Sequence, residues 1–241
     1  MHEQDVTLLS LGACSVSQDS FLSLLKGISL NSIEFIKIKQ DDPLFKKVLA
    51  FRYNKYCVEH DFEKKEDFPD GLETDSYDRY SIHFAAIAKS TQKIVGTVRL
   101  ILGSEVKLPA ECCFDLNGDF STKKMNVGEV SRFAITKKHD IVCQEKTRIL
   151  RHFSTSNVVD GLLNCLAREC IEQNISHLYA VMSKGLPVLL ARKKIFYTQV
   201  GSPKEYHGLR APYFVAVDDI LKTNPNLFMD VATRSRVDNV A

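Results

Sequence analysis

The chain has 241 residues, 44% of them hydrophobic and 26% charged, which predicts one globular unit with a sizeable core and excludes collagen-like or wholly disordered chains. The 32 basic and 30 acidic side chains leave a net charge of +2, so overall charge does not indicate nucleic acid as a partner. The charge is uneven along the chain. Residues 59–78 carry nine acidic and two basic side chains, whereas residues 123–152 carry eight basic and three acidic ones.

Three features that would indicate export, membrane insertion or a metal or redox site are absent from the sequence, and they bear on the cellular compartment of the protein. The first residues are acidic and no stretch reaches the roughly 20 apolar residues of a membrane span, so we expect neither a secretion signal nor an integral membrane segment. The seven cysteines have no spacing typical of a zinc site or a redox pair. We therefore expect reduced thiols, no metal site and a cytoplasmic location.

The secondary-structure pattern predicts an α/β fold. Residues 1–30 lack firm helix caps and are interpreted as a mobile or packing-dependent arm, ahead of a single domain over residues 31–241. In chain order the pattern then predicts a strand over 31–38, a helix over 43–60, strands over 80–88, 93–102 and 126–136, a helix after Ser156, a strand over 177–182, a helix over 183–194 capped by Ser183, and strands over 196–200 and 213–217. Residues 103–125 are polar and irregular. Hairpins mixed with crossover helices favour a sandwich with a mixed sheet.

Charged side chains occur where a core is normally apolar. Arg52 stands four residues after Val48 and four before Tyr56, inside the apolar stripe of the first helix, and Arg99 shares a strand face with apolar neighbours. Buried arginines need carboxylate partners, and Asp75 lies just before the strand over residues 80–88. Such a cluster indicates a functional site, although a purely architectural ion-pair cluster would show the same pattern.

The strand over residues 126–136 adds Glu129 and Arg132. Their odd separation places them on opposite faces of a regular strand, so both can face one cleft only if the strand contains a bulge. We therefore predict a β-bulge in this strand if the two residues belong to one site.

Several motifs in the same order resemble the signature of acyl-homoserine-lactone synthases, a group with a GNAT-type fold that also includes N-acyl amino acid synthases. These are Phe51-Arg52-Tyr53 with Phe62, Glu73-x-Asp75-x-x-Asp78, Gly96-Thr97-Val98-Arg99-Leu100 and Glu129-Val130-Ser131-Arg132-Phe133. A second set resembles the acyltransferases associated with PEP-CTERM/exosortase systems. It comprises Tyr56-Cys57-Val58-Glu59, Asp67 to Glu73, Tyr77-Asp78, Val95 to Leu102, Tyr179 to Met182 and Tyr206-His207-Gly208-x-Arg210-x-Pro212.

The resemblance implies a GNAT-like three-layer sandwich with a mixed, mostly antiparallel central sheet. It also implies an N-acyltransferase that moves a long acyl group from an acyl-carrier protein thioester to an amine or amino acid. No tightly bound cofactor is implied, since the acyl-phosphopantetheine of the carrier, or acyl-CoA, is a co-substrate. The lactone-synthase signature includes a Trp, and this chain has none, which disfavours S-adenosylmethionine as the acceptor.

The resemblance assigns roles to residues of this sequence. Glu129 would position the amine or relay its proton, and Arg99 and Arg132 would complete the catalytic group by pairing with the acidic residues, Glu129 included. The predicted acceptor-binding network comprises Arg52, Asp75, Asp78 and His207. Backbone amides of Phe133, Ala134 and Ile135 would hold the thioester in an opening between the strands over 126–136 and 177–182.

No Gly-rich turn of the kind that binds the pyrophosphate of CoA follows the strand over residues 126–136. Basic residues follow it instead: Lys137, Lys138, Lys146, Arg148 and Arg151. They predict either a docking surface for an acidic carrier protein or a solvated basic loop. Two alternatives to this function are a catalytically silent module that binds acyl groups or carrier protein, and a CoA-dependent acetyltransferase. His207 could equally stabilise a turn.

Overall fold

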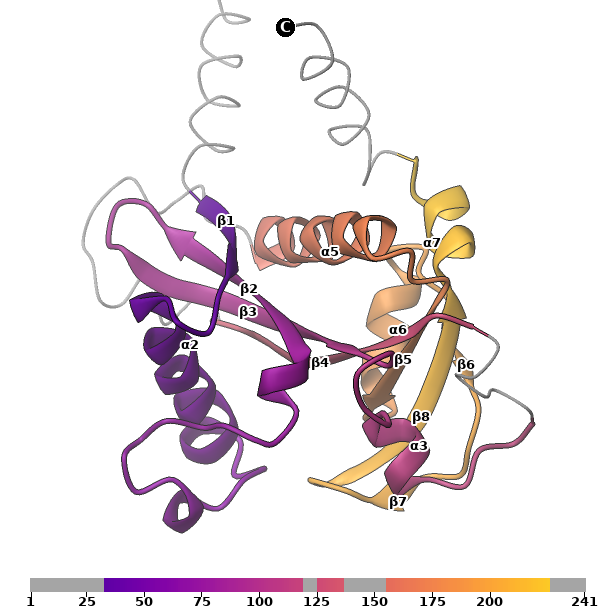
Figure 1. The fold of residues 1–241 in the computed structure, drawn as a ribbon, viewed down its shortest axis with the longest axis horizontal. Coiled ribbons are helices and arrows are strands. Elements are labelled where there is room, and N and C mark those ends of the chain that lie inside the picture. Colours follow the sequence, from indigo (N-terminus) through magenta and orange to yellow (C-terminus); the bar gives the residue numbers. More distant parts are fainter. Residues whose placement is uncertain (1–32, 119–124, 137–154, 226–241) are drawn as a thin grey trace, which may run out of the picture.

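The computed structural model describes residues 33–118, 125–136 and 155–225 (Figure 1). The predicted arm over residues 1–30 lies outside these ranges. The described strands are β1 (Ile33–Ile38), β2 (Ser81–Ala88), β3 (Lys93–Leu102), β4 (Val127–Ile135), β5 (His177–Met182), β6 (Thr198–Gln199), β7 (Lys204–Glu205) and β8 (Leu209–Ala216). They form one sheet in the order β1-β2-β3-β4-β5-β8-β6, with β7 paired to β8.

The sheet lies between two layers of helices. The described helices are α2 (Pro43–Tyr53), which continues as a π-helical turn (Asn54–Glu59), α3 (Pro109–Cys113), α5 (Thr155–Glu172), α6 (Gly185–Ala191) and α7 (Val217–Thr223), with short 3-10 turns at Lys65–Asp67 and Asp78–Tyr80. Figure 1 shows α5 on one face of the sheet and α2 on the other. Among the described strand pairs, only β4 and β5 run parallel, so the predicted three-layer sandwich with a mostly antiparallel sheet is confirmed.

The helix α2 begins where the sequence indicates. The Asp42 carboxylate accepts a hydrogen bond from the backbone N–H of Leu44 at 2.8 Å, and Pro43 occupies the first turn, where its missing N–H has no cost. The predicted extent to residue 60 is close to the observed end at Glu59, but the last turn is π-helical rather than α-helical. This wider turn starts just after Arg52, at Asn54.

The sequence prediction was wrong at several elements, and it contained neither β7 nor α7. The irregular stretch over residues 103–125 contains α3, whose Glu111 side chain accepts from the backbone N–H of Leu108 at 3.1 Å. Ser183 does not cap α6, because that helix begins at Gly185 and has no side-chain cap. The last strand starts at Leu209 rather than residue 213, and Val217 already belongs to α7.

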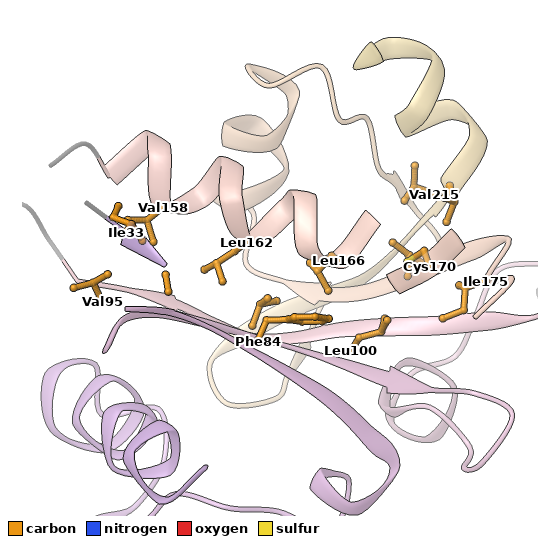
Figure 2. Packing of buried hydrophobic residues seen from close by; sticks show 14 of the residues in the cluster. Ile33, Phe84, Val95, Leu100, Val158, Leu162, Leu166, Cys170, Ile175 and Val215 are labelled. Carbon is orange, nitrogen blue, oxygen red and sulfur yellow. The ribbon is translucent and has the colours of Figure 1, made fainter. Parts of the chain in front are cut away.

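The main core lies between α5 and the sheet (Figure 2). Val158, Leu162 and Leu166 of α5 repeat every four residues and face Phe84 of β2 and Leu100 of β3, all of them buried. Smaller apolar clusters lie on the opposite face, under α2 and α3. The polar side chains described next belong to that opposite face.

Candidate functional site

A bulge in β4 brings the side chain of Arg132 to the sheet face that carries Glu129 and Ser131. Thr97 of β3 pairs with Ala134, but Arg99 pairs with Ser131, so two residues of β4 stand opposite one residue of β3. Arg132, at the bulge, has a φ of 49°, in the left-handed region. Glu129 and Arg132 consequently line the same pocket, and the bulge predicted from their odd spacing is confirmed.

Arg52 is fully buried and is neutralised by two acids from the segment that follows α2. Its guanidinium donates to Glu73 through Nε and to Asp78 through Nη1, the second bond measuring 2.7 Å. Glu73 is also fully buried. A buried arginine without such partners would be strongly destabilising, so these bonds tie residues 73–78 to α2.

Arg99 of β3 joins the same network from the sheet. Its Nη1 donates to Asp78 at 2.7 Å, and its Nη1 and Nη2 together hold Asp75 in a bidentate pair. Its Nε donates to the Ser131 hydroxyl at 2.9 Å. Asp78 therefore accepts from both Arg52 and Arg99, which links the helix, the loop and the sheet through one carboxylate.

Arg132 completes the network from β4. Its guanidinium donates to Glu73 at 2.8 Å and to Glu63 at 3.1 Å, and it lies 3.1 Å from a carboxylate oxygen of Asp75. It also lies 5.3 Å from the ring centre of Tyr56, in a cation–π arrangement. The three arginines at positions 52, 99 and 132 are thus paired with four carboxylates, at positions 63, 73, 75 and 78. We call these seven residues the ion-pair network.

The arginines keep three acids of the ion-pair network ionised: Glu73, Asp75 and Asp78. Burial alone would raise the pKa of Asp78, but Arg52 and Arg99 outweigh it and hold the pKa well below its ordinary value. Burial likewise opposes ionisation of Glu73, and Arg52 and Arg132 lower its pKa. These side chains are fixed charges at neutral pH.

Glu129 is in a different electrostatic state. It is 1% exposed and accepts a hydrogen bond from the backbone N–H of Ala110 at 2.9 Å, and no described residue forms an ion pair with it. Burial raises its pKa to about 8, while the Ala110 N–H and the charge of Arg99 act in the opposite direction. The predicted pairing of Glu129 with an arginine was therefore wrong, because α3, which the sequence pattern did not reveal, supplies its partner. A carboxyl group with a pKa near neutrality can both accept and release a proton.

Two cavities meet at β4 and β5. The backbones of these strands pair only from Val127 with His177 to Glu129 with Tyr179, and beyond that point they separate. A polar pocket of about 60 Å³ lies on the side of the ion-pair network, and Glu129 lines it together with Asp75, Arg99 and Arg132. The opening that we predicted between the two strands is present.

The second cavity is large and apolar, with a volume of about 680 Å³. It extends between the sheet and α5, α6 and α7, where Val159, Leu163, Ala180, Leu190 and Ile220 are among its lining residues. Side chains that line both cavities mark their junction: Tyr56, Val130, Ser131, Arg132, Val181 and Arg210. The charged pocket and the apolar cavity therefore adjoin at these six side chains.

The hairpin between β7 and β8 forms one wall of the polar pocket. His207 has a φ of 51° and Gly208 a φ of 91°, so the turn at this position needs left-handed backbone, which favours glycine. Nδ1 of His207 lies 3.1 Å from a carboxylate oxygen of Glu63. The backbone carbonyl of His207 accepts a hydrogen bond from Arg210 Nε at 3.0 Å. Arg210 forms no ion pair with any carboxylate of the described ranges, and its guanidinium lies 4.8 Å from the centre of the Phe62 ring.

The structure distributes the predicted site residues over three places. Asp75, Arg99, Glu129, Arg132 and His207 line the polar pocket. Arg52 and Asp78 line neither cavity, and they bind each other within the ion-pair network. Phe133 and Ile135 line the apolar cavity, whereas the buried Ala134 lines neither. The predicted carrier-docking residues Lys137, Lys138, Lys146, Arg148 and Arg151 lie outside the described residues.

Sequence reasoning missed four residues of the site. Glu63 and Glu73 complete the ion-pair network, and Tyr206 and Arg210 line the polar pocket. Glu73, Tyr206 and Arg210 could have been found, since the motifs of the resemblance already included them, whereas Glu63 belongs to none of these motifs. Within the described ranges no group of three or more His, Cys, Asp or Glu side chains could hold a metal ion, and no helix has the length and apolar character needed to cross a bilayer.

Comparison with known proteins gives the class of this fold. Residues 51–140 match the family described as acetyltransferase (GNAT) domain, and no curated protein matches the chain. The matched residues carry Arg52, the acids at 73–78, Arg99, Glu129 and the β4 bulge. The match and the observed fold together support an acyltransferase.

Several solved structures share this architecture at low sequence identity. TofI, solved in a ternary complex with an inhibitor and MTA, has 17% identity and a TM-score of 0.63, over 83% of this chain and 98% of that one. BjaI, a CoA-dependent acyl-homoserine lactone synthase with SAM and isopentyl-CoA, has 17% identity and a TM-score of 0.59, over 82% and 90%. FeeM, an N-acyl amino acid synthase from uncultured soil microbes, has 13% identity and a TM-score of 0.55, over 79% and 93%. These likenesses establish the fold.

The ion-pair network yields a prediction about stability. We expect Asp78→Asn to lower the free energy of unfolding in urea by about 3–5 kcal/mol, because it leaves Arg52 and Arg99 buried with one partner fewer. Asp160→Asn is the control: Asp160 also pairs with a cation, Lys193, but its side chain is 40% exposed, so the loss should stay below about 1 kcal/mol. Equal losses of unfolding free energy in the two variants would contradict the proposed contribution of the ion-pair network to stability.

Proposed function

We propose that this protein is an N-acyltransferase that moves a long acyl chain from an acyl-carrier protein thioester to the amino group of an amine or amino acid. The observation that carries the proposal is the junction of the two cavities. An apolar cavity of about 680 Å³ is far larger than an acetyl group needs, and it shares lining side chains with a pocket lined by Glu129 and three arginines. Burial of each methylene contributes about 0.8 kcal/mol, so such a cavity favours long chains.

The thioester would sit where β4 and β5 separate. Its acyl chain would extend among the side chains of α5, α6 and α7, and its carbonyl would lie beside the bulge of β4. A bulge leaves its extra residue without a partner in the strand ladder, so backbone N–H groups near Arg132 and Phe133 become available there. Such N–H groups would stabilise the negative charge that develops on the carbonyl oxygen.

Glu129 would take the proton of the acceptor amine. The neutral amine attacks the thioester carbon, a C–N bond forms and the C–S bond breaks. The amine proton passes to the Glu129 carboxylate, directly or through one water, and the leaving thiolate takes up a proton. A pKa of about 8 suits this role, because the carboxyl group exchanges a proton readily near neutral pH.

Arg210 favours an amino acid over a simple amine as the acceptor. It lies at the junction of the cavities, and its partners in the described structure are a backbone carbonyl and an aromatic ring rather than a carboxylate. Burial lowers the pKa of its guanidinium, yet an arginine stays protonated at neutral pH. It would therefore hold the acceptor's carboxylate while Glu129 faces the amine.

Three finer parts of the proposal rest on the sequence. The donor is proposed to be a carrier protein because the stretch after β4 is basic and lacks a Gly-rich turn, although BjaI, a structural neighbour, is CoA-dependent. Cytoplasmic location and association with an exosortase system are also proposed. Cell fractionation and the neighbouring genes in the genome test these two points, since a membrane-external location or an unrelated gene neighbourhood would contradict them.

Glu129→Gln tests the reaction itself. We expect lipid extracts of cells that express the wild type to contain new N-acyl amines or amino acids by mass spectrometry, and extracts with Glu129→Gln to lack them. With purified protein, the variant should lower the rate of thiol release by about 10²–10⁴-fold and remove the ionisation near pH 8 from the rate profile, while the acceptor amine's own titration persists.

Glu105→Gln is the matched control, because Glu105 is exposed and lies outside both cavities. Wild-type protein that binds acyl donors but releases no thiol with any amine or amino acid would contradict the proposal and indicate a silent binding module. Activity confined to acetyl-CoA would indicate an acetyltransferase.

Ala167→Phe tests the acyl cavity. Ala167 of α5 is buried and lines the cavity, so a larger side chain should fill part of it. We expect the rate with long acyl donors to fall by at least tenfold and the rate with short ones to stay within about twofold, with thermal melting to confirm folding. An unchanged chain-length profile in a folded variant would show that the acyl chain does not occupy this cavity.

Arg210→Met tests the acceptor. Loss of a charged hydrogen bond of about 1.5–3 kcal/mol predicts a KM for amino acids raised by about 10- to 100-fold, with little effect on the corresponding decarboxylated amines. The control is Arg79→Met, because Arg79 is exposed and its guanidinium lies 4.7 Å from the ring of Tyr80, outside both cavities. An equal effect on amino acids and amines would refute the assignment.

A further inference from the structure

Helix α6 is apolar in sequence yet buries none of its residues. Leu186, Leu189 and Leu190 line the apolar cavity, so one side of the helix forms its wall. Val188 is 58% exposed and Leu189 is 53% exposed, and Phe196, shortly after the helix, is 60% exposed. Because Leu189 is both exposed and part of the lining, the cavity reaches the protein surface at α6.

Cationic side chains flank these apolar ones. Lys184 and Arg192 bound α6 in helical conformation, and Val188 stands four residues from each, so the three lie on one face of the helix. Lys193 and Lys194 follow Arg192. In the part of the chain that the structure describes, one carboxylate pairs with these cations, that of Asp160, which binds Lys193. We call the exposed apolar and cationic side chains of residues 184–196 the α6 patch: Lys184, Val188, Leu189, Arg192, Lys194 and Phe196.

We propose that the α6 patch docks the protein on an anionic lipid bilayer, with the mouth of the apolar cavity against the membrane. The patch combines the two features of helices that lie in a membrane interface: large apolar side chains that enter the acyl region and cations that bind anionic headgroups. Exposed apolar side chains grouped on a surface mark an interaction site, and the excess of cations selects an acidic partner.

A bilayer fits this surface better than a protein partner for a reason that rests on the proposed function. A product with a long acyl chain loses about 0.8 kcal/mol for every methylene that passes from the cavity into water. An opening that faces a bilayer lets the chain move between two apolar environments instead. The apolar side chains of the α6 patch would line that route, whereas contact with an acidic protein would rely chiefly on the cations.

The test is co-sedimentation of the full chain with phosphatidylcholine vesicles, with and without phosphatidylglycerol. We expect binding to the anionic vesicles at low salt and its loss at high salt. Val188→Ser with Phe196→Ser should weaken the binding at least tenfold, and neither residue lines the cavity. Lys184→Glu with Lys194→Glu should weaken it by one to two orders of magnitude at low salt.

Val58→Ser with Ile171→Ser is the matched control, because these side chains are 49% and 48% exposed but lie in the π-helical turn and on α5. It should bind vesicles as the wild type does. Wild-type protein that stays in the supernatant, or patch variants that bind normally, would overturn the proposal. Loss of affinity for an acidic acyl-carrier protein without any vesicle binding would identify the α6 patch as a carrier site instead.

Acylation measured in solution without vesicles separates this inference from the proposed function. Activity without vesicle binding refutes only membrane docking. Vesicle binding without activity refutes only the acyltransferase assignment and leaves the docking surface in place.

Discussion

The site depends on charge neutralisation between Arg52 and the segment over residues 73–78. Arg52 is fully buried in a helix that packs on the sheet, and Glu73 and Asp78 are its acidic partners. Arg99 and Arg132 share these acids, so the position of each guanidinium depends on the others. A pair of buried charges contributes little net stability, whereas a single unpaired one is severely unfavourable. The network therefore restricts the chain to the arrangement in which helix, loop and strands meet.

The pairing of acids with arginines also explains why Glu129, which has no such partner among the described residues, has a raised pKa. Glu73, Asp75 and Asp78 face guanidinium groups that lower their pKa values, so they stay ionised, whereas Glu129 accepts a hydrogen bond from the backbone of α3. Burial without a cationic partner shifts its pKa towards neutrality. One sheet face thus carries fixed charges and one carboxyl group whose pKa lies near neutrality, and the proposed acyl transfer would use that carboxyl group to take a proton.

The sheet separates this polar chemistry from an apolar space on its other face. The two cavities adjoin where β4 and β5 stop pairing, beyond Glu129 and Tyr179, so the proposed thioester would have its carbonyl beside the polar pocket and its chain among apolar side chains. The same cavity reaches the surface at α6, where exposed apolar and cationic side chains meet. Acyl transfer and membrane docking are thus two proposals about adjoining cavities.

The sequence by itself determined the fold class, the long strands, α2 and α5, because hydrophobic periodicity and capping are local properties. It also determined that Arg52 and Arg99 need acidic partners and that Glu129 and Arg132 need a bulge between them, since an isolated charge in a core and a strand period of two leave few alternatives. Which acid meets which arginine was decided only by the tertiary structure. The same is true of the contact between α3 and Glu129, of the cavity, and of the place of Arg210 where the two cavities adjoin, because each brings together segments that are far apart in the chain. Such contacts depend on packing in three dimensions, and no local pattern encodes them.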